Sequence, residues 1–159
     1  MKAVGLKRYL PIDHPESLID FEAEMPHPSG HDLLIKVEAL SVNPVDSKVR
    51  APKDQAIEEN KILGWDAYGT VVSVGQNVTL FSPGARVYYA GDVTRQGCNS
   101  EFHLVDERIT GHAPRSLSAA ETAALPLTTL TAWEAMFDRM SISISGSEPG
   151  SDKPSILII

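Results

Sequence analysis

The amino-terminal two thirds of the chain contains short apolar runs that are separated by Pro, Gly, Asn, Asp and Ser. In residues 33–41 the apolar Leu33 and Ile35 fall on one face and Lys36 on the other, which is the period of two of a half-buried strand. This pattern predicts a mainly β fold, arranged as a barrel or a sandwich. The predicted strands are residues 2–7, 18–24, 33–41, 69–75, 86–90 and 101–105.

A short helix is predicted directly after the third strand. Asn43 can act as its cap, and Pro44 is tolerated at the first helical position because the missing N–H is not needed there. Asp46 places a negative charge near the positive helix end. We expect this helix to run through Arg50.

Two further helix signals follow the predicted strands. Residues 118–121 (Ser-Ala-Ala-Glu) form a capping box that opens a short alanine-rich helix, which Pro126 should stop. A second helix is predicted through about Met140. It begins either near Leu127 or at a second capping-box match at Thr131.

The end of the chain has a different character. Residues 141–155 are rich in Ser, Gly and Pro and are typical of a linker, whereas residues 156–159 (Ile-Leu-Ile-Ile) are typical of a strand buried on both faces. We therefore predict one β-rich domain over residues 1–125. Residues 126–159 would form a connecting helix, a linker and the first strand of a second, α/β domain.

Charge and cysteine content exclude several classes of protein. The net charge of −7 opposes the phosphate attraction on which nucleic-acid and anionic-membrane binding depend, so neither partner is expected. The single cysteine, Cys98, excludes an intrachain disulfide framework and suggests a reducing compartment. The first residues contain no long apolar run, and we expect a cytoplasmic protein without a signal peptide or membrane anchor.

The residues alone offer no obvious catalytic or metal centre. His27 and His31 are separated by Pro28 and Gly30, which disfavour the helix that would put both rings on one face, so we assign no metal there. Cys98 has no nearby histidine in the sequence to activate it. The chain also lacks a Gly-x-Gly-x-x-Gly or P-loop phosphate motif.

Five segments in a fixed order carry a family resemblance. They are Met1-Lys2-Ala3-Val4; Ser41-Val42-Asn43-Pro44-Val45-Asp46; Leu63-Gly64-Trp65-Asp66-Ala67-Tyr68-Gly69-Thr70-Val71-Val72; Phe81-Ser82-Pro83-Gly84 with Val87; and Ala124-Leu125-Pro126-Leu127-Thr128-Thr129-Leu130-Thr131-Ala132-Trp133-Glu134-Ala135. Together they resemble the medium-chain dehydrogenase/reductase superfamily. The resemblance is closer to its quinone oxidoreductase-like branch and to the group called zinc-binding alcohol dehydrogenase family proteins.

The resemblance implies a two-domain enzyme. The expected fold is an amino-terminal GroES-like catalytic domain, a partly open β-barrel, joined to a Rossmann domain that binds NADPH or NADH. In such proteins the strand that residues 156–159 resemble leads into a glycine-rich pyrophosphate loop, which is not in this chain. We therefore expect the 159-residue chain alone to be inactive, and a homodimer is possible for the complete protein.

The resemblance also locates the positions of the catalytic zinc ligands. They correspond to Asn43, Trp65 and Leu127, and none of these side chains is a good zinc ligand. No zinc is therefore expected. Without a Lewis acid, the chemistry that the resemblance implies is hydride reduction of an electrophilic acceptor, which is a quinone or an α,β-unsaturated carbonyl.

Candidate site residues follow from this comparison. Asn43 and Lys48 are the predicted catalytic donors to the charge that develops on the carbonyl oxygen. Each has a simpler interpretation, since Asn43 can be only a helix cap and Lys48 only a solvated charge. Thr131 occupies the position of a nicotinamide-contacting threonine. The predicted substrate cleft contains Asp46, Trp65, Asp66, Tyr68 and Tyr88.

Two other functions remain open at this point. One is a stand-alone GroES-like interaction module, although residues 125–140 and the apolar end at Ile159 serve no purpose there. The other is a zinc-dependent alcohol dehydrogenase, which needs metal ligands that the sequence does not show.

Overall fold

The structure is a computed structural model that describes residues 1–142. The predicted strand at residues 156–159, and all but the first two residues of the predicted linker, lie outside the described part. The chain divides into two compact units, Met1–Leu127 and a second unit that begins at Thr128. None of the helices in the described part is long and apolar enough to cross a membrane.

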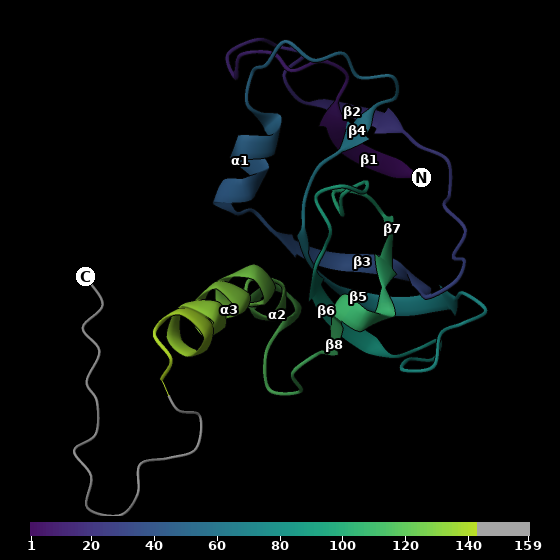
Figure 1. Cartoon of the computed structure of the whole chain (residues 1–159). Coiled ribbons are helices and arrows are strands. Elements are labelled where there is room, and N and C mark those ends of the chain that lie inside the picture. Colours follow the sequence, from purple (N-terminus) through teal and green to yellow (C-terminus); the bar gives the residue numbers. More distant parts are fainter. Residues whose placement is uncertain (143–159) are drawn as a thin grey trace, which may run out of the picture. The chain divides into compact units, whose positions relative to one another are not determined.

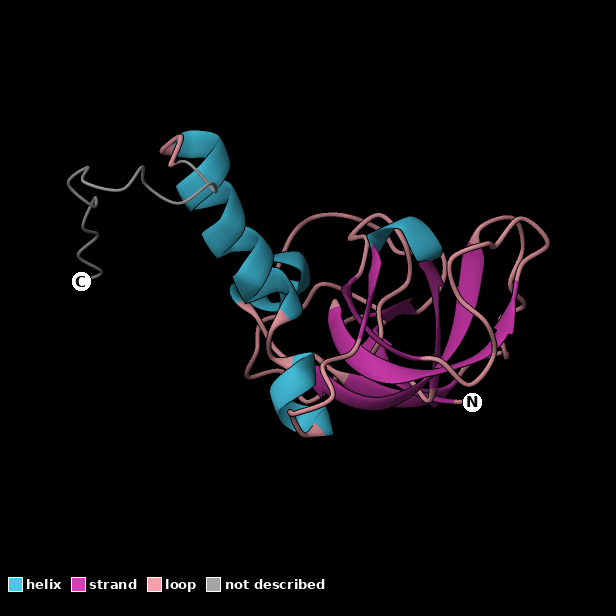
Figure 2. Ribbon diagram, turned by 90° about the horizontal axis from the view of Figure 1, so that it is seen from below, coloured by secondary structure: helices cyan, strands magenta, loops and turns pink. Residues whose placement is uncertain are grey.

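Two antiparallel sheets form the first unit (Figures 1 and 2). The smaller sheet has the order β2-β1-β4, with β1 at Lys2–Leu6, β2 at Ile19–Glu22 and β4 at Lys61–Ile62. The larger has the order β7-β3-β5-β6-β8. Its strands are β3 at Asp32–Ser41, β5 at Asp66–Val74, β6 at Arg86–Ala90, β7 at Phe102–Asp106 and β8 at Thr110–His112. The sheets do not close on each other in residues 1–127, so the predicted mainly β fold with a partly open barrel is confirmed.

Short helices connect or follow the strands. They are α1 at Pro44–Arg50, the 3₁₀ turn η1 at Glu107–Ile109, α2 at Ala119–Ala123, α3 at Pro126–Trp133 and the π-helical turn η2 at Glu134–Arg139. The helix predicted after the third strand is confirmed with its boundaries. Pro126 ends the chain's short alanine-rich helix and starts α3, so Thr131 is internal to α3 and is not its cap.

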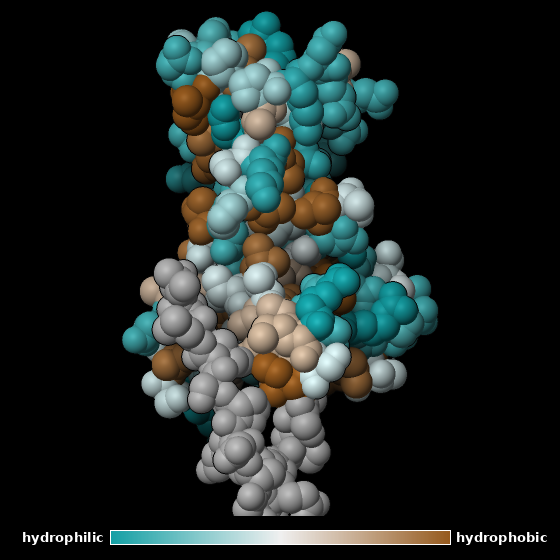
Figure 3. All heavy atoms as spheres, turned by 60° about the vertical axis from the view of Figure 1, so that its left-hand side comes forward, coloured by the Kyte–Doolittle hydropathy of each residue, from teal (hydrophilic) through white to brown (hydrophobic). Residues whose placement is uncertain are grey.

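The core of the first unit lies on one face of the larger sheet. Alternate residues of its strands point inward, as the period of two predicts. Apolar side chains also reach the surface, where Figure 3 shows them interspersed among polar residues, and Val42 is 75% exposed. The buried members of this core are Leu33, Ile35, Ala67, Val71, Phe81, Val87, Tyr89, Cys98 and Val105.

A polar pair is buried at the edge of this core. The Tyr89 hydroxyl and His103 Nδ1 are 2.9 Å apart, and His103 Nε2 lies 2.9 Å from the backbone oxygen of Gln96. Because a carbonyl only accepts, Nε2 carries the hydrogen and Nδ1 accepts from Tyr89. Burial lowers the pKa of His103 to about 4, against the opposing effect of the hydrogen bond to Gln96.

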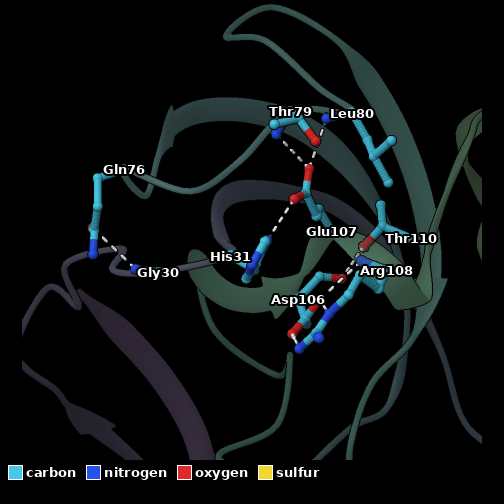
Figure 4. Close-up of polar contacts among 9 residues, drawn as sticks. All are labelled: Gly30, His31, Gln76, Thr79, Leu80, Asp106, Glu107, Arg108 and Thr110. Carbon is cyan, nitrogen blue, oxygen red and sulfur yellow. Dashed lines mark hydrogen bonds and ion pairs between the residues drawn. The ribbon is translucent and has the colours of Figure 1, made fainter.

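A buried carboxylate joins three loops at the other end of the sheet (Figure 4). Glu107 is 2% exposed and accepts hydrogen bonds from the backbone N–H of Thr79 and of Leu80, at 2.9 and 2.7 Å. Its other oxygen lies 2.7 Å from His31 Nδ1. Burial raises the pKa of Glu107, but these three donors outweigh burial and the pKa is lowered.

Two glycines adopt the left-handed conformation for different reasons. Gly64 has φ +92°, and a Cβ there would lie 2.1 Å from Oδ1 of Asn99. Gly84 has a similar φ of +89°, but a Cβ there would meet nothing within 4 Å. Gly64 is therefore required both by backbone conformation and by close packing, whereas Gly84 is required by conformation alone.

We predict that Gly64→Ala destabilises the chain more than Gly84→Ala does. The second change should cost about 1–2 kcal/mol, the usual penalty for a left-handed residue with a Cβ. The first should cost about 2 kcal/mol more, because Asn99 must also move. Urea denaturation of both variants measures the difference, and equal costs would contradict the packing argument.

We also predict that acid destabilises the chain through His103. In the unfolded state this side chain protonates near pH 6.5, but in the folded state only near pH 4. The unfolded state therefore binds more protons between these values, and the free energy of unfolding should fall by about 1–2 kcal/mol from pH 7 to pH 5.

Chemical denaturation at several pH values checks this decrease. His103→Gln should remove this part of the slope, whereas His27→Gln, a change at an exposed histidine, should leave it intact. A slope that survives in His103→Gln would show that another group is responsible.

Candidate active site

The predicted site begins where β3 ends and α1 begins. Val42 is exposed and Asn43 is only 9% exposed, so the alternation of the strand turns the Asn43 side chain inward. The backbone N–H of Asn43 donates to Oδ2 of Asp46 at 2.7 Å, which satisfies a donor at the start of α1. Local sequence thus fixes both residues at the junction.

Asp66 connects this junction to a distant part of the chain. It is the first residue of β5 and is fully buried, with 0% exposure. Its Oδ2 accepts a hydrogen bond from Asn43 Nδ2 at 2.8 Å. Both of its oxygens accept from the backbone N–H of Leu127, at 3.1 and 3.3 Å. One carboxylate therefore holds together the ends of three segments.

Burial disfavours the charged form of the Asp66 carboxyl. Desolvation raises the pKa of this carboxyl, the hydrogen bonds from Asn43 and Leu127 lower it, and the nearby Asp46 raises it further. The pKa is raised overall. Asp46 is itself 9% exposed, and its Oδ1 has no hydrogen-bond partner among residues 1–142. The two carboxylates therefore form a pair of like charges beside the amide of Asn43.

Two predicted tyrosines lie on the same face of the larger sheet as Asp66. Tyr68 is two residues further along β5, and Tyr88 is directly opposite Tyr68 on β6. Residues two apart on a strand, and residues directly opposite on paired strands, share a face. Tyr68 is buried and Tyr88 is half-buried. Strand register thus groups three predicted cleft residues.

The side chains of Trp65 and Lys48 make no hydrogen bond to this group among the described residues. Trp65 is 2% exposed in a cluster with Leu6 and Leu63, and its indole N–H donates to the backbone oxygen of Asp92 at 3.1 Å. Lys48 is exposed on α1, and no hydrogen bond or ion pair in the described residues joins it to Asn43. The roles predicted for these two side chains stay predictions.

Thr131 is exposed on α3 and belongs to the second unit. Its contact with a nicotinamide also stays a prediction.

The first unit also contains a hollow that is lined by other residues than those of the predicted site. It measures about 970 Å³ and lies between β1, β2 and the second half of β3. Its lining residues include Val4, Phe21, Leu40 and Glu101 but none of the predicted site residues. The polar group around Asp66 is thus distinguished by its chemistry and not by the size of a cavity.

One contributor to the group could not be recognised from the sequence. The family resemblance assigns Leu127 to a zinc-ligand position, but the atom of Leu127 that contacts Asp66 is its backbone nitrogen. A backbone donor carries no residue-type signal. The only cue was Pro126, which places Leu127 in the first turn of α3, where N–H groups lack helical partners.

The comparisons with known proteins give the family. Residues 29–133 match the alcohol dehydrogenase GroES-like domain. The chain therefore belongs to this family, within the medium-chain dehydrogenase/reductase superfamily.

Curated relatives carry two kinds of name. A zinc-type alcohol dehydrogenase-like protein of Staphylococcus epidermidis is 41% identical over 100% of this chain and 46% of its own length. A chloroplastic quinone-oxidoreductase homolog of Spinacia oleracea is 33% identical over 90% of this chain and 44% of its own length. The chain spans a little less than half the length of either relative.

Solved structures agree with the fold. A Rhizobium etli CFN 42 protein described as a zinc-dependent alcohol dehydrogenase has a TM-score of 0.84 and 52% identity, over 94% of this chain and 44% of its own. A mycobacterial protein solved in complex with NADPH has a TM-score of 0.72 and 28% identity, over 86% of this chain and 40% of its own. These neighbours confirm the predicted resemblance.

The residues at the positions that the family resemblance assigns to the zinc ligands do not fit a zinc ion. The Asn43 amide donates to Asp66, the Trp65 indole donates to Asp92, and Leu127 offers an N–H where a metal needs a lone pair. The described residues also contain no group of three His, Cys, Asp or Glu side chains that could hold a metal ion. Burial raises the pKa of Cys98 to about 12, so it is a thiol and not a thiolate ligand.

We predict that the purified chain carries far less than one zinc per molecule. The reason is the donor set just described, in which hydrogen-bond donors occupy the ligand positions. Elemental analysis of protein purified without added metal checks this directly. One tightly held zinc per chain, surviving dialysis against a chelator, would contradict it.

Proposed function

We propose that this chain is the catalytic domain of an NAD(P)H-dependent oxidoreductase that reduces quinones or α,β-unsaturated carbonyls without zinc. The observation that carries the proposal is the hydrogen bond that anchors the Asn43 amide to Asp66, at a position that the family resemblance assigns to a metal ligand. The names of the quinone-oxidoreductase relatives support the substrate class, and the neighbour solved with NADPH supports the cofactor.

The amide of Asn43 supplies what the proposed reaction needs. When bound, the nicotinamide supplies a hydride, and negative charge then develops on the oxygen of the acceptor. Asn43 Nδ2 carries two hydrogens, and one of them forms the hydrogen bond to Asp66. The second is available to the acceptor oxygen, where a positioned donor stabilises charge that exists only in the transition state.

The other predicted residues complete this proposed site. Tyr68 and Tyr88 would present a ring face and hydroxyls to a planar quinone, and Lys48 would be a second donor. Thr131 would contact the nicotinamide, while the pyrophosphate and ribose would bind a domain beyond these residues. We also retain the proposal that residues 1–125 act as the catalytic unit and residues 126–159 as the connection.

A zinc-dependent alcohol dehydrogenase is the alternative that the names of the more similar relatives favour. The donor set at Asn43, Trp65 and Leu127 speaks against it. The zinc measurement above separates the two functions.

We predict that the 159-residue chain shows no measurable affinity for NADPH and no quinone reduction, whereas a form continued through a complete cofactor domain shows both. Most of the binding energy of a dinucleotide comes from its pyrophosphate and ribose. Calorimetric titration with NADPH and a steady-state assay with a simple quinone, performed on both lengths, measure this. Robust turnover by the short chain would contradict the two-domain proposal.

In the longer form we predict that Asn43→Ala lowers kcat by about 100-fold, with the KM for NADPH changed by less than about 3-fold. Lys48→Ala should lower kcat less, because the lysine is exposed and its charge is solvated. Lys36→Ala, a change at an exposed lysine of β3, serves as the matched control and should leave kcat unchanged. An Asn43→Ala enzyme with native kcat would remove Asn43 from the proposed mechanism.

A further inference from the structure

The hydrogen bond between Asp66 and Asn43 determines which way the amide faces. An asparagine can present either its oxygen or its nitrogen to a neighbour, and the two ends have nearly the same shape. An ionised carboxylate only accepts hydrogen bonds, so the nitrogen must face Asp66. The amide oxygen is then directed away from Asp66, and the remaining hydrogen of Nδ2 has a fixed direction.

The same carboxylate restrains the start of α3. The backbone N–H of Leu127 lies within reach of both oxygens of Asp66, although the two residues are 61 positions apart in the sequence. Asp66 is fully buried and Asn43 is 9% exposed, so the hydrogen bond between their side chains is shielded from water. An acceptor at Asp66 therefore satisfies the buried side-chain donor of Asn43, which would be costly to leave without a partner.

We propose that Asp66 is the positioning residue of this site. Its carboxylate orients the Asn43 amide with the nitrogen inward, fixes the second amide hydrogen as the donor offered to a substrate oxygen, and ties the backbone at Leu127 to the β3–α1 junction. The orientation and the tie rest on the hydrogen bonds alone. The effect on a substrate oxygen rests on the proposed function.

Asp46 provides a contrast within the same cluster. It is also a buried aspartate next to Asn43, but its carboxylate accepts the backbone N–H of Asn43, whereas the side-chain N–H of Asn43 donates to Asp66. Exchanging its carboxylate for an amide therefore leaves the Asn43 side chain with its acceptor. Asp46→Asn is thus a matched control for Asp66→Asn in any measurement of the amide orientation.

The first test uses nuclear magnetic resonance on the 159-residue chain. In the native chain, one side-chain amide hydrogen of Asn43 should exchange with solvent at least about 10-fold more slowly than the other and should be shifted downfield, because only one is bonded to a carboxylate. Leu127 N–H should also exchange slowly. Equal, fast exchange of both Asn43 hydrogens would overturn the proposal without any variant.

The second test uses the two variants. Asp66→Asn should speed the exchange of the protected Asn43 hydrogen and of Leu127 N–H by at least about 10-fold, because an amide in place of Asp66 offers one acceptor oxygen where two were used. Asp46→Asn should change both rates by less than about 3-fold. Unchanged rates in Asp66→Asn, or equal changes in both variants, would overturn the assignment.

The third test measures activity in the longer form. Asp66→Asn should lower kcat by about 10- to 100-fold with little change in the KM for NADPH, and the double variant with Asn43→Ala should have about the same kcat as Asn43→Ala alone. Asp20→Asn, an exposed carboxyl of β2, controls for loss of charge. Independent, multiplying effects of Asp66→Asn and Asn43→Ala would contradict a shared role.

The two kinds of test fail separately. If the proposed reaction is wrong, no length of the protein reduces quinones, but the exchange rates of Asn43 and Leu127 still report on Asp66. If Asp66 does not position the amide, the exchange rates of Asn43 and Leu127 do not change in Asp66→Asn, whether or not the longer form is active.

Discussion

The buried carboxylate of Asp66 is the constraint on which the site depends. It is fully buried and beside a second carboxylate, Asp46, so it is costly unless its oxygens are satisfied. It is satisfied by one side-chain donor, on Asn43, and one backbone donor, on Leu127. The positions of these three groups are therefore coupled. The Asp66 carboxylate, whose burial would be unfavourable without partners, connects three segments of the chain.

The rest of the first unit supplies the position of this carboxylate. Gly64, in a left-handed conformation that only glycine adopts readily, leads the chain into β5. The register of β3 with β5 then places Ser41 opposite Asp66, so that Asn43 follows within reach of the carboxylate. The core packed on the other side of β5 fixes that register, because a slip by one residue would turn Ala67 and Val71 out of the core.

The sequence was sufficient where structure depends on local pattern and insufficient where it depends on distant partners. Alternation over residues 33–41 predicted β3, and Asn43-Pro44 predicted α1 with its boundaries. The strands β4 and β8 are only two and three residues long, too short to show a period, and were missed. Asp66 was placed in the site through the family resemblance, but its partner at Leu127 is a backbone group 61 residues away, which no residue pattern encodes.

The central claim is that Asp66 and Asn43 act as one unit, and a double-mutant cycle on the free energy of unfolding tests it most directly. Asp66→Asn and Asn43→Ala would be measured singly and together by chemical denaturation of the 159-residue chain. A charge-assisted hydrogen bond predicts a coupling energy of about 1–3 kcal/mol, because the second change removes a contact that the first has already broken. Free energies that add within about 0.5 kcal/mol would show that the two residues contribute independently and would contradict this account.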